Sequence, residues 1–380
     1  MSNPAFDNSL QPKYARITQS LREQIMQGEL RPGDRLPSFT EMKARHGIAL
    51  STIEKVISTL EQEGLVERQH GRGTFVKQQE RQKTGYIGFI ASASHATPLS
   101  PYHTSLMGGV QQAIEAAGQH MLYMGTDYTW DVGLCDKVDG VLICGIEDMA
   151  SVLSQLPAHL PRVSALNVVA GITCVGVDEY RSAQMAVRHL LQLGHRRIAC
   201  LMEAGLSIPR MRFSGYRDTM LEAGIEPEEA WMRSVLIKAN KKDEPKQPYH
   251  LWARNQMSEW LSNGWHETGC TAILVQNEVA AIGAMQALQQ AGIDVPGQVS
   301  VMGFDGTQLC ELSSPRLSTI ALPLEEIGKQ AVELLNRQIA GEPALGQAIM
   351  LPCNLREGDS LACLKPHSEL EDVVLLGSSP

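Results

Sequence analysis

The chain has 380 residues and a formal net charge of −9, with 43% hydrophobic and 20% charged residues. That length exceeds one ordinary core and suits two or three domains of roughly 100–200 residues each. No window reaches the ~18 uncharged apolar residues of a membrane-spanning helix, and the start, MSNPAFDNSLQPKYAR, lacks the apolar core of a secretory signal. These features exclude disordered and fibrous classes and predict a soluble, cytoplasmic protein with no membrane partner.

The eight cysteines are scattered along the chain, and none forms a CxxC pair or a Cys/His cluster of zinc spacing. Several stand within apolar runs, where a free thiol behaves as a small hydrophobic group. We therefore expect all eight to be structural, and we expect neither a metal nor a cofactor.

Charge is distributed unevenly along the chain. Residues 1–83 hold 13 Lys and Arg against 10 Asp and Glu, a balance of +3, whereas the remainder has 20 against 32, or −12. A mildly basic head on an acidic body is compatible with nucleic-acid contact through the head alone.

Residues 13–77 have the pattern of a small helical domain that ends in a hairpin. Apolar residues at helical spacing predict helices over 14–27, 38–45 and 51–63. Two short apolar pieces then bracket QHGRG, which predicts a hairpin with a glycine-rich tip. Three helices and a hairpin make a winged helix-turn-helix, and the polar stretch over 78–84 is the expected linker.

From residue 85 onward, short apolar runs alternate with helical segments. This alternation predicts buried parallel strands with crossover helices, and so a doubly wound α/β fold. The expected strands are 86–90, 120–124, 140–144, 162–166, 173–177, 197–202, 271–275 and 299–304. The expected helices are 103–117, 183–193, 212–223 and 279–291.

Two family resemblances rest on longer strings. GELRPGDRLPS and GIALSTIEKVISTLEQEGLVERQHGRGTFV resemble the amino-terminal domain of GntR-type regulators. The stretches VGVDEYRSAQMAVRHLLQLGHRRIACL, RFSGYRDTMLEAGI, TAILVQNEVAAIGAMQALQQAGIDVPGQVSVMGFDGT and LSTIALPLEEIGKQAVELL resemble the effector-binding core of LacI/GalR regulators. A head of the first type on a body of the second resembles the architecture of arabinose-responsive repressors.

The LacI/GalR resemblance implies the fold of a periplasmic sugar-binding protein, with two α/β lobes joined by three crossovers and the ligand in the cleft. It places the effector-binding domain at 85–362, followed by a tail over 363–380. Within that domain it assigns lobe one to 85–178 and 319–345, and lobe two to 179–318 and 346–362.

The GntR resemblance also identifies a departure. GntR-type heads usually present three arginines of the helix-turn-helix to DNA, and the matching positions here are Thr40, Leu50 and Glu54. Glu54 follows Ser51 by three residues, which is the spacing of a capping box. The alternatives are that Glu54 accepts a hydrogen bond from cytosine N4, or that the head has lost DNA binding.

The hairpin keeps the family's glycine-arginine-glycine tip, where Arg72 suits the minor groove or a phosphate. The plain alternative is a tight turn with a solvated arginine. With few arginines we expect one head to bind weakly, because each lost phosphate contact lowers the salt slope by roughly 0.9. A homodimer on an inverted-repeat operator in double-stranded DNA would compensate. The candidate DNA contacts are Lys43, Ser51, Thr52, Glu54, Lys55, His70, Gly71 and Arg72.

Polar residues at the carboxyl ends of the body strands match ligand-contacting positions of LacI/GalR regulators, and ligands of doubly wound lobes bind at that edge. Asn277 as a helix cap and Asp305 as a turn residue are the plain alternatives. The set suits a small sugar or polyol, and Tyr102 and His103 are expected in the loop after the first body strand. The candidate effector contacts are Tyr102, His103, Asn167, Arg212, Asn277 and Asp305.

Two features depart from the LacI/GalR pattern. The segment between Tyr123 and Asp139 is short, which predicts a turn near 130–135 in place of a helix. Leu322 replaces a polar residue that is common at the crossover strand. Ligand identity therefore cannot be copied from any one relative.

The motif search favours a regulator over an enzyme. No nucleophile elbow, phosphate-binding loop with its lysine, or HExxH motif occurs. We predict a ligand-responsive, sequence-specific transcriptional regulator, a repressor controlled by a small sugar-like effector. The alternative is a cytoplasmic small-molecule sensor whose DNA-binding head is weakened, or reads DNA only with ligand or a partner.

Overall fold

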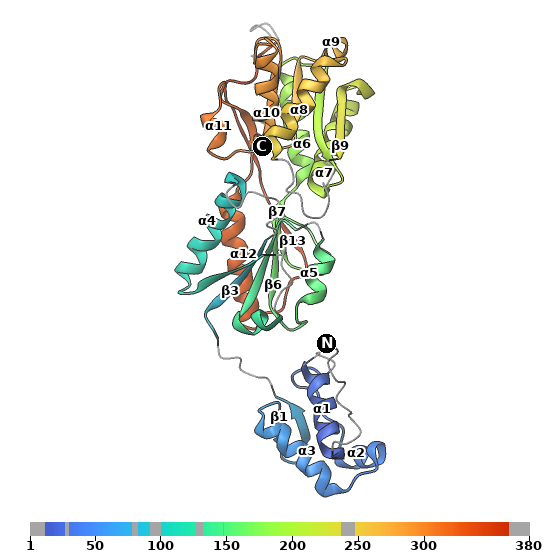
Figure 1. Cartoon of the computed structure of the whole chain (residues 1–380). Coiled ribbons are helices and arrows are strands. Elements are labelled where there is room, and N and C mark those ends of the chain that lie inside the picture. The colour runs from blue at the N-terminus through green and yellow to red at the C-terminus, as the bar shows by residue number, and fades with distance from the viewer. Residues whose placement is uncertain are drawn as a thin grey trace, which may run out of the picture. The chain divides into compact units, whose positions relative to one another are not determined.

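The structure is a computed structural model that describes residues 12–26, 30–77, 83–91, 100–125, 132–146, 148–236 and 248–364. The chain divides into two compact units, a head and a body, with a boundary between Thr84 and Gly85 (Figure 1). Each unit has its own hydrophobic core, so each is described by itself.

The head is a winged helix-turn-helix, as predicted. Its apolar spacing places Ile53, Val56, Ile57 and Leu60 on the inner face of the third helix, where all four are buried. The predicted helices are confirmed, with ends that differ by one residue, while residue 27, the predicted end of the first helix, lies outside the described residues. The elements are α1 (Lys13–Met26), α2 (Phe39–His46), α3 (Leu50–Gln62), β1 (Val66–Gln69) and β2 (Gly73–Val76).

The capping box of the head lies on a different helix from the predicted one. Ser38 caps α2: its backbone N–H donates to Glu41 Oε2 at 2.7 Å, and its hydroxyl accepts from the Glu41 N–H at 3.3 Å. Helix α3 begins at Leu50 after Ala49, and no side chain caps it. The predicted pairing of Ser51 with Glu54 is therefore wrong, because the chain enters the helix before Ser51 and leaves that hydroxyl inside the first turn.

The wing is an antiparallel pair in which Val66 faces Val76 and Gln69 faces Gly73. The segment before α2 adds to it: the Leu36 N–H donates to the Thr74 carbonyl at 2.8 Å. The RPGDRL stretch, residues 31–36, thus forms the outer edge of the wing.

Lobe one of the body is a six-stranded parallel sheet in the order β13-β7-β6-β5-β3-β4. In Figure 1, α4 and α12 lie together on one side of this sheet and α5 on the other. The strands are β3 (Tyr86–Ala91), β4 (His120–Gly125), β5 (Gly140–Cys144), β6 (Arg162–Ala165), β7 (Cys174–Val177) and β13 (Ala348–Leu351). The helices are α4 (Pro101–Ala116), α5 (Met149–Gln155) and α12 (Leu324–Ile339).

Lobe two is a second six-stranded sheet, in the order β14-β12-β11-β10-β8-β9, in which only β14 runs antiparallel. Helices α6 and α7 pack against each other, as do α8 and α10. The strands are β8 (Ile198–Ala204), β9 (Met232–Leu236), β10 (Ala272–Val275), β11 (Ser300–Asp305), β12 (Ser318–Ala321) and β14 (Asn354–Arg356). The helices are α6 (Glu179–Gln192), α7 (Ser207–Glu222), α8 (Tyr249–Ser262), α9 (Trp265–Thr268), α10 (Glu278–Gln290) and α11 (Leu309–Leu312).

The chain passes between the lobes three times: from β7 to α6, from β12 to α12, and from β13 to β14. The last two passages fall a few residues after the predicted points near 319 and 346. Strand β12 stays with lobe two because it pairs with β11, and β13 joins lobe one because it pairs with β7. The two-lobed α/β fold class is nevertheless as predicted.

The short segment of lobe one contains a 3₁₀ helix over Val132–Lys137, close to the predicted turn, while residues 130 and 131 lie outside the described residues. Sequence reasoning did not assign α5, α8, α12, β9, β12, β13 or β14 as separate elements. Across the described ranges, none of the helices is long and apolar enough to cross a membrane.

Candidate DNA-contacting surface and effector site

The outer face of α3 carries small and charged side chains. Ser51, Glu54 and Lys55 are exposed and Thr52 is half-buried, while the intervening apolar residues face the core. Leu50, at one of the positions where the GntR resemblance expects arginine, is 55% exposed. An exposed leucine there supplies no charge to a phosphate.

Glu54 is paired with the wing. Its carboxylate lies 3.3 Å from the Arg68 guanidinium on β1. The same guanidinium lies 3.1 Å from the carboxylate of Glu61, which is about two helical turns further along α3. No local pattern in the sequence indicates this pairing, because Glu54 and Arg68 are 14 residues apart. Two carboxylates thus offset the one arginine that lies between helix and wing.

Lys55 lies against the first helix. Its Nζ is 4.0 Å from the centroid of the Tyr14 ring on α1, a cation–π contact. Lys43 is exposed in the last turn of α2. Of the two lysines proposed to contact DNA, Lys55 therefore packs on an aromatic ring, whereas no such contact is described for Lys43.

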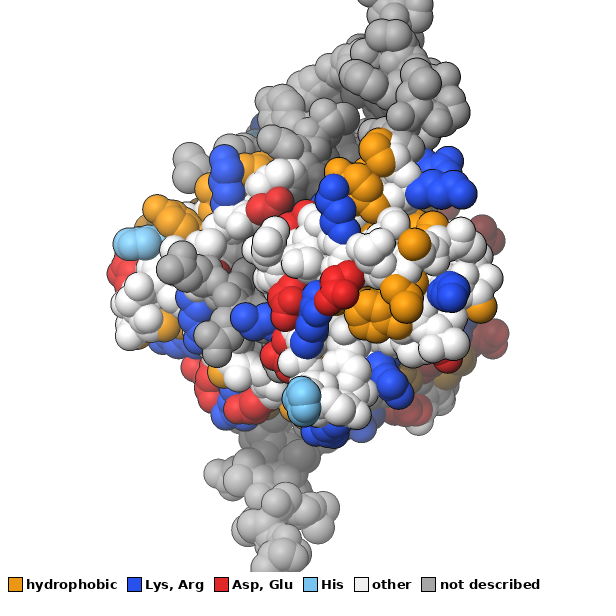
Figure 2. All heavy atoms as spheres, turned by 90° about the horizontal axis from the view of Figure 1, so that it is seen from below, with side chains coloured by type: hydrophobic (Ala, Val, Ile, Leu, Met, Phe, Trp, Pro, Cys, Tyr) orange, Lys and Arg blue, Asp and Glu red, His pale blue; other side chains and the backbone are white. Residues whose placement is uncertain are grey.

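The wing tip presents His70, Gly71 and Arg72, all exposed. Gly71 has φ +73°, which favours glycine. Gly73 has φ +123°, and a Cβ there would lie 2.7 Å from Arg35 Nε, so the arginine side chain packs against the wing backbone. Figure 2 shows basic and acidic side chains interspersed on the face it presents.

In the body, Arg212 on α7 is the centre of a buried polar cluster. Its Nε donates to Glu179 Oε2 at 2.7 Å, a second nitrogen donates to the Gln276 carbonyl, and Nη2 lies 3.5 Å from Asp305 Oδ1. The guanidinium also stacks 4.1 Å over the Phe304 ring. Burial alone would lower the pKa of Arg212, but the two carboxylates more than offset that effect and raise it.

Asp305 is the last residue of β11 and has φ +93°, so a non-glycine residue occupies the left-handed region. Burial raises its pKa to about 7, with the Glu278 and Glu179 carboxylates adding to the rise and Arg212 opposing it. The predicted placement at a strand end is correct. Such strain and perturbation are characteristic of functional sites.

Tyr102 and His103 lie in the first turn of α4, not in the loop where they were expected. The helix begins early because Ser100 caps it and Pro101 occupies its first position. Burial, together with the charges of Asp305 and Glu179, raises the pKa of Tyr102 well above its ordinary value. Tyr102, a lobe-one side chain, is therefore within range of the charges of the lobe-two cluster.

His103 is oriented by the cap itself, because its Nδ1 lies 2.6 Å from the Ser100 hydroxyl. Asn277 caps α10, with its Oδ1 accepting from the Ala280 N–H at 2.8 Å. Asn167 follows β6 and has a buried Oδ1 without a hydrogen-bond partner in the described structure. The structure therefore joins Arg212 to Asp305 directly, leaves Tyr102 within range of their charges, and gives Asn277 a capping role.

Sequence reasoning missed the acidic partners of this cluster. Glu179 is the first residue of α6, and Glu278 begins α10 and accepts from the Thr307 N–H at 2.8 Å. Each follows a capping residue, Asp178 or Asn277, and so looked like an ordinary first-turn acid. Their burial is the property that sequence does not show.

All eight cysteines are free thiols, and six of them are buried. Within the described residues no cluster of three His, Cys, Asp or Glu side chains is arranged to hold a metal.

A winged head with an exposed recognition helix, followed by a two-lobed α/β body with a buried polar cluster at the strand ends, is the architecture of a ligand-responsive DNA-binding protein. Residues 13–76 match the gntR family of bacterial regulatory proteins, and residues 187–361 match the periplasmic binding protein-like domain.

Individual relatives agree with this class. The HTH-type transcriptional regulator DegA of Bacillus subtilis is 30% identical over 277 residues, which cover 67% of this chain and 76% of DegA. The arabinose metabolism transcriptional repressor of Geobacillus stearothermophilus is 25% identical over 347 residues, 86% of this chain and 91% of the repressor. A LacI family regulator from Enterococcus faecium with bound ribose shares the fold, with TM-score 0.62, 23% identity and coverage of 74% and 100%.

The chain belongs to the bacterial HTH-type transcriptional regulators of the GntR/LacI kind, which join a GntR-family head to a periplasmic-binding-protein-like body. It is a ligand-responsive, DNA-binding transcriptional repressor and not an enzyme, as the sequence predicted.

Proposed function

We propose that this repressor is a cytoplasmic homodimer that binds an inverted-repeat operator through its two heads. Its affinity for the operator falls or rises when a sugar or polyol binds to the body. The single observation that carries the effector assignment is the buried pair of Arg212 and Asp305, whose Nη2 and Oδ1 lie 3.5 Å apart at the strand ends. The arabinose repressor named above supports a carbohydrate as the class of effector.

The chemistry of the cluster suits hydroxyl groups. Asp305 accepts hydrogen bonds, the Arg212 fork donates them, and adjacent hydroxyls of a sugar can do both at once. The contact between Arg212 and Asp305 is long for a hydrogen bond. Two sugar hydroxyls placed there would form shorter hydrogen bonds to both side chains and would replace only this weak contact. A ring face of the sugar would then meet Tyr102.

Ligand would change DNA binding through the lobes. A ligand that contacts Tyr102 on one lobe and Arg212 on the other binds only one arrangement of the lobes well. It shifts the equilibrium between arrangements by that difference in affinity and no more. The sign of the response depends on which arrangement spaces the two heads for the operator.

On the DNA side, we assign base or phosphate contact to Lys43, Ser51, Thr52, Lys55 and the wing tip His70, Gly71 and Arg72, and we place Glu54 facing the DNA, where only cytosine N4 could donate to it. Since Lys55 packs on Tyr14 and Glu54 pairs with Arg68, both would have to exchange a protein contact for DNA. The wing tip needs no such exchange among the described contacts, so Arg72 is the residue on which affinity should depend most.

The first experiment incubates the full chain with fragmented genomic DNA from its source and sequences what is retained at two salt concentrations. Enrichment of a two-fold-symmetric site supports the proposal, and Arg72→Ala should weaken retention while Arg217→Ala, on the exposed face of α7, should not. Retention without sequence preference overturns sequence-specific repression. Gel filtration at micromolar protein tests the dimer, and a monomer with and without ligand would contradict it.

The second experiment identifies the effector class. A panel of sugars and polyols is screened for an increase in the thermal unfolding temperature, which any ligand of the native state produces. A hit should lose its effect in Asp305→Asn and keep it in Arg217→Ala. Hits that stabilise Asp305→Asn equally would place the ligand elsewhere.

A weakened head remains the second candidate function, favoured by the neutralisation of Arg68 between Glu54 and Glu61. Under this alternative the chain senses a small molecule and binds DNA only with ligand or a partner present. Repeating the DNA retention with the effector found in the screen distinguishes the two candidates, because only this alternative requires ligand for any specific binding.

A further inference from the structure

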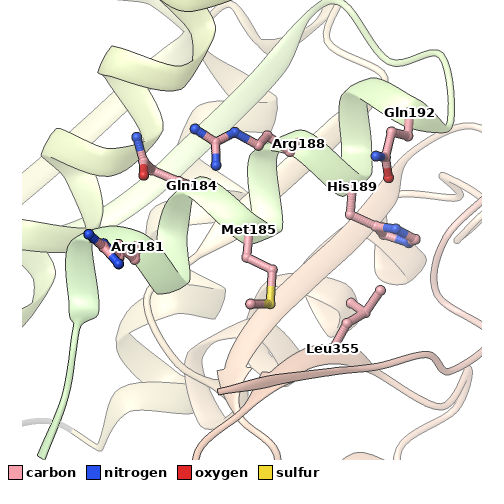
Figure 3. A pocket seen from close by; sticks show the side chains of 7 residues that line it. All are labelled: Arg181, Gln184, Met185, Arg188, His189, Gln192 and Leu355. Carbon is pink, nitrogen blue, oxygen red and sulfur yellow. The ribbon is translucent and has the colours of Figure 1, made fainter. Parts of the chain in front are cut away.

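The outward face of α6 forms, with one residue of β14, a shallow hollow of about 620 Å³ on lobe two. Figure 3 shows Met185 and His189 turned toward the strand that carries Leu355, with Gln184 and Arg188 on the opposite side of the helix. The lining residues are Arg181, Gln184, Met185, Arg188, His189, Gln192 and Leu355.

This hollow is cationic along its edge and apolar on its floor. The side chains of Arg181 and Arg188 are 82% and 54% exposed. Their acidic neighbours, Asp178 at 3.3 Å and Glu222 at 3.1 Å, form surface pairs of small net energy that a better-placed carboxylate can displace. Met185 is 37% exposed, an apolar side chain left at the surface between the two arginines.

The carboxyl-terminal part of the chain starts beside this hollow. The N–H of Leu364, the last described residue, donates to the carbonyl of Leu193 at 2.8 Å, and Leu193 is the residue that ends α6. The Ala362 carbonyl lies 3.1 Å from His195 Nε2. The described part of the chain therefore ends beside the carboxyl end of α6, the helix whose face forms the hollow.

The sequence of residues 365–380, KPHSELEDVVLLGSSP, complements the hollow in kind. Three acids, Glu369, Glu371 and Asp372, come first, and the apolar run 373–376 follows. Back along α6 from Leu193, His189 and Arg188 come first, then Met185, then Arg181, so the apolar Met185 lies between the two arginines.

The distances allow this match. Arg188 is five residues from Leu193 along α6 and Arg181 twelve, about 8 Å and 18 Å at 1.5 Å per residue. Glu369 is five residues beyond Leu364, a reach of up to about 17 Å at 3.4 Å per residue, and residue 374 can reach about twice as far. Glu369 can therefore reach Arg188, and Asp372, eight residues beyond Leu364 with a reach of about 27 Å, can reach Arg181, while the apolar run is long enough to reach Met185 and Leu355.

We propose that residues 365–380 bind the α6 hollow of the same chain, with Glu369, Glu371 and Asp372 on the arginines and the apolar run 373–376 on Met185 and Leu355. Helix α6 begins at Glu179, the partner of Arg212, so a tail held on this helix lies on an element that also forms the polar cluster. The proposal concerns this binding alone and holds whether or not the ligand is a sugar.

The test uses the full chain with a photoreactive benzoylphenylalanine in place of Val374, irradiated at submicromolar protein and mapped by mass spectrometry. We expect crosslinks within one chain to the segment of α6 around Met185. Arg181→Glu with Arg188→Glu should lower their yield by roughly tenfold, because two attractions become repulsions. The matched control, Arg217→Glu on α7, should leave the yield unchanged.

A charge exchange separates binding from misfolding. Adding Glu369→Lys, Glu371→Lys and Asp372→Lys to the reversed helix should restore the crosslink, whereas the same tail on the native helix should not crosslink there. The proposal would be overturned by crosslinks to other surfaces or by crosslinks between chains only. A crosslink yield that stays unchanged in both charge-reversed variants would overturn it as well. DNA binding and effector binding are measured separately, so their failure would not affect this result.

Discussion

Arg212 Nε lies 2.7 Å from the carboxylate of Glu179, and this bond joins α7 to the residue that begins α6 directly after the first crossover between lobes. Both side chains are almost fully buried. The guanidinium is thereby fixed at the strand ends with its remaining donors directed at the Gln276 carbonyl and Asp305. A charge held in this way is costly to leave without its partner.

Arg212→Leu should therefore destabilise the protein by about 3–5 kcal/mol, because it leaves buried carboxylates uncompensated. Urea unfolding followed by tryptophan fluorescence reports on lobe two directly, since Trp231, Trp252, Trp260 and Trp265 are all in its core. Arg217→Leu is the control, because its pair with Asp218 is a surface pair and should cost less than about 1 kcal/mol. Equal losses for the two variants would contradict the argument.

The raised pKa of Asp305, about 7 in the fold against 3.8 for the free side chain, predicts a pH dependence of stability. The folded state holds this proton more tightly than the unfolded state, so its contribution is fully present below pH 4 and is lost as the pH rises through about 7. Asp305→Asn cannot titrate and should lack this part of the slope. Unfolding free energies of both proteins at pH 5 and pH 8 measure it, and parallel slopes would exclude the effect.

Glu54→Gln should strengthen DNA binding by the head. The substitution removes one negative charge from the outer face of α3 and releases Arg68 from one of its two carboxylates. Affinity should rise, and the salt slope should steepen by up to about 0.9 if Arg68 then reaches a phosphate. Titrations at two salt concentrations decide this, with Glu23→Gln on α1 as the control. Weaker binding would instead mean that Glu54 contacts a base.

Gly109→Ala should destabilise lobe one where α4 crosses α12. A Cβ on Gly109 would lie 2.0 Å from the Glu325 carbonyl oxygen, so the helices would have to separate, at a cost of at least about 1–3 kcal/mol. Gly108→Ala is the matched control, because its Cβ would meet nothing within 4 Å and alanine should stabilise the helix by about 0.5–1 kcal/mol. The thermal unfolding temperature should fall for Gly109→Ala and rise for Gly108→Ala. A change in the same direction for both variants would contradict the packing argument.

The strand ends show how far sequence reasoning reaches at the effector site. Asp305 and Asn277 were found because the carboxyl ends of buried strands are visible as the points where apolar runs stop. Glu179 and Glu278 were not found, because an acid in the first turn of a helix is usually a solvated partner of the helix dipole. Only the packing of α6 and α10 against their sheet shows that both are buried.

The head shows the same division. Apolar spacing alone specified three helices and a hairpin, since a buried helical face repeats every three to four residues. The same sequence placed the capping box on α3, whereas Ser38 and Glu41 form it on α2. The pairing of Glu54 with Arg68 depends on where the wing returns against the helix, a contact between residues 14 apart.

The sequence by itself therefore determined the winged helix-turn-helix, the α/β pattern and the polar residues at strand ends, because periodicity encodes them, and its resemblance to GntR and LacI/GalR regulators implied the regulator function. The tertiary structure decided which side chains are buried together, that β12 and β13 belong to opposite lobes, and that the last described residue of the chain is bound to the end of α6. These depend on contacts between distant segments, for which no local pattern exists: hydrogen-bond pairing between strands and the burial of charge are settled only when the sheets assemble.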